Sequence, residues 1–170
     1  RSEDSTGNYI DYSYILPEFS YLGEGTQYLL SSVTYTGKRA LPGQTSASIP
    51  YAGIYFQYQV KVPAAEQKVG LAYQGGVAYV QDQELVSVEV RDRIDTPTPR
   101  VVRYYEPAYH NSASGTGDRL LTGMQECRDG SKAVCYPATS FSWSDDAGIR
   151  HGFDTADRLT GQGESRDLKS

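Results

Sequence analysis

The sequence predicts an all-β fold, either a β-sandwich or an open antiparallel meander of about seven to eight short strands with little helix. Tyrosine is in excess, with 15 Tyr against 4 Phe and 1 Trp, and aromatic residues favour strands. The 17 Gly and 8 Pro divide the chain into short runs that leave little room for long helices. Within these runs apolar and polar residues alternate, which is typical of half-buried strands.

The N-terminal elements lie between clear turn signals. A turn at residues 6–8 precedes the first expected strand, residues 9–16, in which Ile10, Tyr12 and Tyr14 share one face before Pro17 ends the strand. A second strand covers residues 29–35 and stops at Gly37, and residues 38–50 form a long surface loop.

The clearest alternation covers residues 54–60. One face has Ile54, Phe56, Tyr58 and Val60, and the other has Tyr55, Gln57 and Gln59. Residues 85–94 alternate in the same way, with Val86, Val88 and Val90 pointing inward. The remaining expected strands cover residues 101–109, 120–126 and 134–143. Pro107 places the first of these three at a sheet edge or at a bulge.

Between residues 64 and 82 the pattern is weaker, with one helical turn expected at residues 64–68 and a bend or hairpin at Gly75 and Gly76. We expect one β-rich domain over residues 1–144, a fragment of a larger protein, followed by a linker or disordered tail over residues 145–170.

Composition excludes several classes of protein. The net charge of -5 argues against nucleic-acid binding, because neutralising phosphates requires a basic surface. No run approaches the roughly 18 apolar residues of a membrane-spanning helix. His110 and His151 are not at metal-ligand spacings, so we expect no metal site.

The sequence contains no recognisable enzyme motif, and we expect no catalytic residues and no cofactor. The glycine-rich run at residues 114–118 lies between strands and does not begin a helix, as a phosphate-binding loop would. Asp4 and Asp145 each precede a glycine turn, which predicts side-chain-capped turns in place of calcium loops. A hydrolase that uses an unrecognised carboxylate pair ranks last among the possible functions.

Cys127 and Cys135 flank a turn at Asp129-Gly130 and could lie opposite each other on paired strands. A disulfide there would close a loop of about nine residues and stabilise the fold by roughly 2–3 kcal/mol. Two free thiols are the alternative. We predict the bonded form, and we also predict that Trp143 is largely buried beneath the last hairpin.

The tyrosines have two interpretations. Rows of exposed aromatic side chains can bind sugars, which would make the chain an extracellular carbohydrate-binding β-sandwich. Strand residues whose rings pack within a sheet are the simpler interpretation, because the tyrosines follow the two-residue period on several strands.

Two segments resemble a known family. Residues 4–14 have the form Asp-x-x-Gly-Asn-x-x-x-Tyr-x-Tyr, which includes Gly7, Asn8, Tyr12 and Tyr14 and resembles the strand–turn–strand unit of Rhs (YD-repeat) shells. Residues 102–127, followed by Cys-x-Pro-x-Thr-x-Phe-x-Trp at residues 135–143, are similar to the SpvB-type N-terminal region of insecticidal toxin complex B components. The family positions in this second unit include Pro137, Phe141 and Trp143.

The resemblance implies a non-catalytic β-domain of a large secreted or cell-surface bacterial toxin, which helps to form the shell or adaptor around a toxic payload. Its expected partners are other domains of the same toxin polypeptide or other subunits of the toxin complex, with glycans as a further possibility. The ADP-ribosylating activity of some relatives lies in a separate domain, and this sequence has no motif for it.

Overall fold

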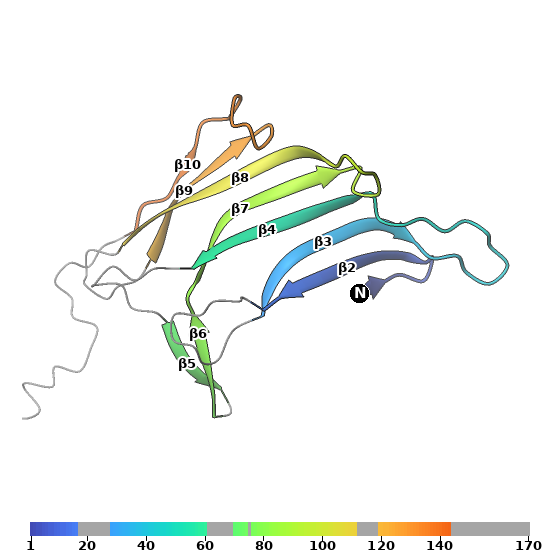
Figure 1. Ribbon diagram of the computed structural model, residues 1–170, viewed down its shortest axis with the longest axis horizontal. Coiled ribbons are helices and arrows are strands. Elements are labelled where there is room, and N and C mark those ends of the chain that lie inside the picture. Colours follow the sequence, from blue (N-terminus) through green and yellow to red (C-terminus); the bar gives the residue numbers. More distant parts are fainter. Residues whose placement is uncertain (17–27, 61–69, 75, 112–118, 144–170) are drawn as a thin grey trace, which may run out of the picture.

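The computed structural model describes residues 1–16, 28–60, 70–74, 76–111 and 119–143 (Figure 1). In this part of the chain every regular element is a strand. The strands are β1 (Ser2–Glu3), β2 (Asn8–Ile15), β3 (Leu29–Lys38), β4 (Ala52–Val60), β5 (Gly70–Gln74), β6 (Val77–Gln81), β7 (Gln83–Asp92), β8 (Arg100–Asn111), β9 (Arg119–Cys127) and β10 (Thr139–Ser140).

Eight of the strands form one open antiparallel sheet in the order β1-β2-β3-β4-β7-β8-β9-β10. The order follows the chain except that β5 and β6 form a separate hairpin between β4 and β7, which projects away from the sheet in Figure 1. The all-β prediction is confirmed, and of its two forms the structure has the open meander.

Cross-strand partners give the sheet an apolar face. Tyr12 pairs with Val33, Val33 with Ile54 and Ile54 with Val90, so one row of apolar side chains crosses four strands. A second row on the same face consists of Phe56, Val88 and Tyr105. The alternation in residues 54–60 therefore predicted the face of each side chain.

The opposite face carries more polar side chains. On this face Ser32 pairs with Tyr55, Tyr55 with Glu89, and Glu89 with Tyr104, so one row again crosses four strands. The guanidinium of Arg91 lies 4.5 Å from the centre of the Tyr55 ring and also pairs with Glu89. Rings on this face therefore pack against long charged side chains, which cover them without a second layer of structure.

Few side chains are fully buried in the described part of the chain. Apart from Pro107, the buried apolar residues there are Ala52 and Cys127. Most other strand residues are partly exposed, because no second layer of described residues covers either face of the sheet.

Of the two expected positions for Pro107, the sheet edge is wrong, because β8 has β7 on one side and β9 on the other, whereas a bulge does lie beside the proline. The pairing between β7 and β8 ends at Tyr105, and a bulge follows Pro107 at Ala108 and Tyr109. The missing N–H of the proline therefore removes no bond from the β7–β8 ladder.

The expected strand over residues 134–143 is reduced to β10 and an isolated bridge between Cys127 and Cys135. Pro137 lies between Cys135 and the start of β10 at Thr139, and a proline cannot donate a backbone hydrogen bond. The expected hairpin at Gly75 and Gly76 is present as β5 and β6, with Gly76 at a φ of 84°.

The second strand is longer than expected, because β3 continues through Gly37 to Lys38. The ring of Tyr9 lies directly over Gly37, where no side chain could fit, so the glycine serves the packing of two strands. The helical turn expected at 64–68, most of the loop at 111–118, His151 and the tail at 145–170 lie outside the described residues.

Candidate functional site

The residues that carry the family resemblance lie at two opposite edges of the sheet. Gly7, Asn8, Tyr12 and Tyr14 belong to β2 or to the turn before it, next to the short edge strand β1. Pro137, Phe141 and Trp143 lie in or beside the segment that follows β9 along the other edge. The structure therefore does not gather them into one site, and each edge is described separately.

The turn before β2 is held by the carboxylate of Asp4. One oxygen accepts hydrogen bonds from the backbone N–H groups of Thr6 and Asn8, both at 2.9 Å, and the other accepts one from the Asn8 side-chain amide. These bonds lower the pKa of the Asp4 carboxyl to about 2, mainly through Asn8 and Thr6. The side-chain-capped turn predicted from the sequence is confirmed.

Gly7 is buried inside this turn with a φ of 86°. A Cβ atom at this position would lie 2.6 Å from the carbonyl oxygen of Arg39, and the Arg39 backbone N–H donates to the carbonyl of Gly7 at 2.8 Å. The glycine therefore allows the turn to contact the chain that leaves β3.

Beyond this turn, the second half of β2 is exposed. Tyr12 is 43% exposed, Tyr14 60% and Ile15 43%, and the following Leu16 is 51% exposed. β1 pairs only with Tyr9 and Ile10, so it covers the first half of β2 alone. This edge therefore presents apolar side chains on a strand with no neighbour along residues 11–15 in the described structure.

The other edge is closed by a disulfide. Cys127, at the end of β9, is fully buried and is bonded to Cys135. Around this bond the backbone N–H of Arg128 donates to Val134 and that of Tyr136 donates to Glu126, both at 2.9 Å. The pairing is the one that the sequence predicted, and the returning segment covers the end of β9.

A charged contact supports the same turn. The ammonium group of Lys132 lies 2.7 Å from the Glu106 carboxylate on β8 and 5.5 Å from the centre of the Tyr104 ring. The Glu106 hydrogen bond raises the pKa of Lys132 above its usual value. The disulfide and this contact fix the turn at both its base and its tip.

The aromatic side chains of the returning segment are exposed. Tyr136 is 60% exposed, Phe141 42% and Trp143 54%, although the indole N–H of Trp143 donates to the carbonyl of Leu121 at 2.6 Å. The prediction that Trp143 is buried is wrong. Among the described residues no second layer covers the indole, and its N–H bonds to β9.

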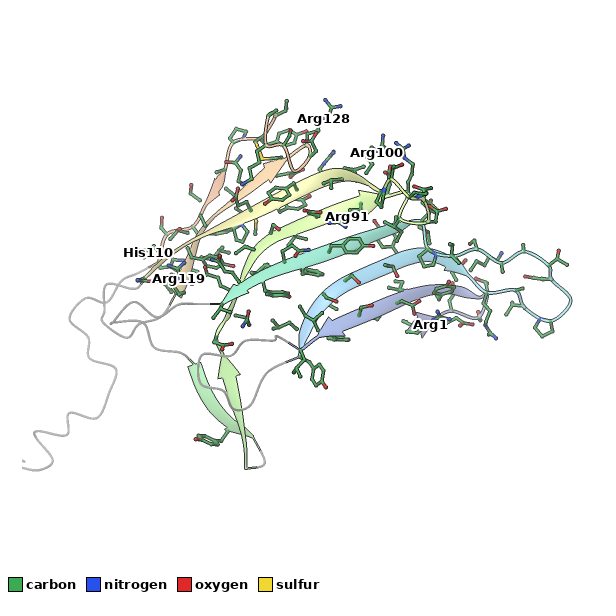
Figure 2. The ribbon with its side chains drawn as sticks, viewed as in Figure 1. Arg1, Arg91, Arg100, His110, Arg119 and Arg128 are labelled. Carbon is green, nitrogen blue, oxygen red and sulfur yellow. A yellow bond between two sulfur atoms is a disulfide. The ribbon has the colours of Figure 1, made fainter. Side chains whose placement is uncertain are left out.

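A partly buried ion pair, in which the Glu84 carboxylate is the buried member, crosses the sheet near the start of β7. Both Nε and one terminal nitrogen of Arg119 on β9 donate to the Glu84 carboxylate, at 2.7 and 2.9 Å, across the intervening strand β8. The Glu84 side chain is 6% exposed, and the Arg119 guanidinium also lies over the ring of Tyr109 on β8. Figure 2 shows Arg119 beside His110 at this end of the sheet.

Burial raises the pKa of Tyr109, and the negative charge of Glu84 adds to this effect. Sequence reasoning missed this cluster because its charged partners are 35 positions apart in the chain and come from non-adjacent strands. The one local signal was Glu84, a charged residue two positions before Val86, at the start of the apolar alternation.

A shallow groove of about 260 Å³ lies at the start of β2, lined by Arg1, Tyr9, Lys38, Arg39, Ala47, Ser48 and Ile49. Both arginines are paired, Arg1 with Asp11 at 2.7 Å and Arg39 with Glu3 at 2.6 Å. The carboxylates neutralise two of its three cationic groups, so the groove is a weak attractor for anions.

The described residues lack two further features. They contain no group of three or more His, Cys, Asp or Glu side chains that could hold a metal ion. They also contain no helix with the length and hydrophobicity needed to cross a membrane.

No protein-family model and no curated protein matches this chain. Among solved structures, it is similar to part of the crystal structure of TcdB2–TccC3, with a TM-score of 0.60, 16% identity and 82% of this chain covered. A structure of TcdB2–TccC3–Cdc42 matches equally well, with a TM-score of 0.61, 14% identity and the same coverage.

The matched region is 8% of the length of each of these solved chains. At these identities the similarity shows the fold alone: this chain shares the fold of that part of the TcdB2–TccC3 structures.

Proposed function

We propose that this chain is a non-catalytic scaffold domain of a large secreted bacterial toxin of the SpvB, Tc or Rhs type. In this role it forms part of the shell or adaptor that carries a toxic payload. Its partners are other domains of the same toxin polypeptide or other toxin-complex subunits.

One observation carries the proposal: an eight-stranded sheet, with almost no buried core among the residues that the structure describes, shares its fold with a small part of TcdB2–TccC3. A sheet that buries so few side chains gains little hydrophobic stabilisation alone. It gains more as one wall of a larger body, where neighbouring domains cover its apolar face.

Two further features support this function. The disulfide suits an oxidising compartment, as expected for a secreted protein. The apolar rows on one face of the sheet, which begin at Tyr12 and Phe56, offer an area on which another domain could pack.

The test is to express the natural gene that encodes this sequence and to image the secreted product by electron cryo-microscopy. We expect a polypeptide much longer than this chain, with the eight-stranded sheet built into the wall of a hollow particle. A free-standing secreted product that joins no larger particle would contradict the proposal.

The non-catalytic role is tested in the same particle. Glu84→Gln replaces the buried carboxylate that pairs with Arg119 with a neutral amide of similar shape. We expect particles with this substitution to keep the full enzymatic activity of the payload once the payload is released. Loss of a hydrolytic activity that the isolated chain itself displays would assign catalysis to this chain.

An extracellular carbohydrate-binding module is the second candidate, favoured by the exposed rings of Tyr136, Phe141 and Trp143 along one edge. Flat aromatic rings pack against the apolar faces of sugars. A glycan array measured with the wild-type chain and with Trp143→Ala tests it, since a sugar platform would lose binding in the variant. Absence of binding to any glycan on the array would remove this candidate.

A further inference from the structure

One covalent bond holds the segment that covers the outer side of β9. Residues 128–143, the returning segment, leave β9 at its end and run back along it as far as β10. The Cys127–Cys135 disulfide joins this segment to β9. Further along, β10 pairs with β9, and the backbone N–H of Phe141 donates to Thr122 at 2.9 Å. The chain itself therefore covers this edge of the sheet.

The disulfide lies between two hydrogen bonds that cross the same pair of chain segments. The N–H of Arg128 donates to Val134, and that of Tyr136 donates to Glu126, both at 2.9 Å. This pattern makes the two cysteines a directly opposed antiparallel pair of the non-hydrogen-bonded type. The Cα atoms in such a pair are about 4.5 Å apart, whereas disulfides prefer about 5.5–6 Å. The pairing of the backbone therefore favours reduction of the bond.

The two sulfur atoms differ in their access to a reductant. In the described structure Cys127 is fully buried, whereas Cys135 is exposed. A thiolate cleaves a disulfide by attacking one sulfur from the side opposite to the leaving sulfur. Attack on Cys135 comes from outside the sheet and makes Cys127 the leaving sulfur, whereas attack on Cys127 would require the reductant to enter a buried position. Exposed disulfides are also the ones that exchange most readily with thiols.

We propose that the Cys127–Cys135 disulfide is a redox-sensitive clip: reduction by a small thiol such as glutathione releases the returning segment from β9, and oxidation closes it again. A glutathione thiolate attacks the Sγ atom of Cys135, the S–S bond breaks, and the Sγ atom of Cys127 takes the electron pair and then a proton. A second glutathione thiolate attacks the glutathione sulfur of the mixed disulfide, which yields oxidised glutathione and the Cys135 thiol. Two glutathione molecules thus supply the two electrons.

The two cysteines are held differently once the bond is broken. Cys127 still pairs with Tyr104 on β8, so it keeps its position in the sheet. At the turn, the ion pair between Lys132 and Glu106 remains, but both side chains are exposed, and such pairs add little stability. Cys135 therefore moves away on reduction, while Cys127 stays in place for reoxidation.

The test uses the full-length natural protein in its oxidised form, with millimolar reduced glutathione and one hundredth as much oxidised glutathione as the probe. Samples are quenched in acid, which protonates the thiolates and stops exchange, and are then digested with pepsin for mass spectrometry. We expect most of the disulfide to be reduced at equilibrium. Early samples should carry glutathione on Cys135 about tenfold more often than on Cys127.

Hydrogen exchange measures the release of the returning segment. In the glutathione mixture, peptides that cover residues 134–143 should exchange about tenfold faster, because the N–H groups of Tyr136 and Phe141 lose their acceptors on β9. Peptides from β4 and β7, in the middle of the sheet, should exchange as before. Replacing the mixture with oxidised glutathione should restore the original exchange.

Lys132→Met provides a matched control, because it removes a second contact that ties the turn to the sheet. In the oxidised variant, residues 134–143 should exchange as slowly as in the oxidised wild type, since the disulfide still holds them. Fast exchange in the oxidised variant would show that the ion pair holds the segment, and would overturn the proposal.

Four further results would overturn it: a disulfide that resists the glutathione mixture, glutathione bound equally to both cysteines, a returning segment that stays protected after reduction, or loss of protection in β4 and β7 together with the segment. The last would make the bond a stabiliser of the whole sheet. The proposal rests on the disulfide and its strand pairing and not on the scaffold function. It can fail in a protein that forms a hollow particle, and it can hold in one that forms none.

Discussion

Gly7 occupies a position where a side chain would meet two obstacles. Its φ of 86° is unfavourable for residues that have a Cβ, and that Cβ would lie 2.6 Å from a carbonyl oxygen of Arg39. Gly43 has a similar φ of 81°, but nothing lies within 4 Å of a Cβ placed there. A side chain at Gly43 would therefore meet only the unfavourable backbone conformation, whereas one at Gly7 would meet both this conformation and the close contact.

We predict that Gly43→Ala lowers the free energy of unfolding by about 1 kcal/mol and Gly7→Ala by about 2–4 kcal/mol. Urea denaturation followed by circular dichroism measures both values. Equal losses for the two variants would show that the contact with Arg39 adds no cost.

Trp143 is the one tryptophan in the chain, so its fluorescence can be assigned without ambiguity. Because the indole is 54% exposed, we expect emission close to that of tryptophan in water and efficient quenching by acrylamide in the native protein. The same measurement in urea is the control, and the emission maximum should hardly move on unfolding. A blue-shifted native spectrum protected from acrylamide would contradict the exposed position.

Sequence reasoning succeeded for Asp4 and failed for Trp143 for one physical reason. The Asp4 turn depends on partners two and four residues away, so local chemistry determines it. Burial of Trp143 depends on whether another layer covers the end of the sheet, which a local pattern does not report.

Among the elements, β7, β8 and β9 are joined by the Glu84–Arg119 ion pair. Removing one partner from a buried pair leaves the other charge poorly solvated, so Arg119→Met should cost about 2–4 kcal/mol of folding stability. Adding Glu84→Gln to this variant should restore part of the loss, since no charge then remains to be buried. A double-mutant cycle measured by urea denaturation tests this, and additive losses would rule out coupling between the two side chains.

The segment after β9 depends on the disulfide. Replacing both Cys127 and Cys135 with alanine should lower the free energy of unfolding by about 2–3 kcal/mol, from the entropy of the open loop. The amides of Arg128 and Tyr136 should then exchange faster, because both are bonded across this loop. Reduction of the wild-type protein should have the same effect and should leave the alanine variant unchanged. Unchanged exchange in both cases would show that Lys132 and Glu106 suffice to hold the segment.

Most strands were predictable, because apolar and polar residues alternate within residues 54–60 and 85–94 and each run ends at a turn signal or a proline. The exceptions have tertiary causes. β3 passes through Gly37 because Tyr9 packs over it, and Pro107 is accepted inside β8 because pairing with β7 ends at Tyr105.

At the scale of the whole molecule, the described sheet lacks a second layer, and its buried apolar residues are few. Unfolding therefore exposes less new surface than it does for a compact domain of similar length. We predict a urea m-value below that of a compact all-β domain of about 170 residues measured in parallel, since this slope scales with the newly exposed area. The native chain should also bind a hydrophobic dye, and an m-value equal to that of the compact domain would contradict the single-layered structure.

The sequence by itself determined the class of the fold, the position of most strands, the Asp4 turn and the pairing of the two cysteines. These features depend on alternation, on turn residues and on partners close in the chain, all of which are local. The tertiary structure decided that the described strands form one open sheet and not a sandwich, that Glu84 meets Arg119 and that Trp143 is exposed. Each of these depends on contacts between distant segments, or on their absence among the described residues, and local patterns carry no information about them.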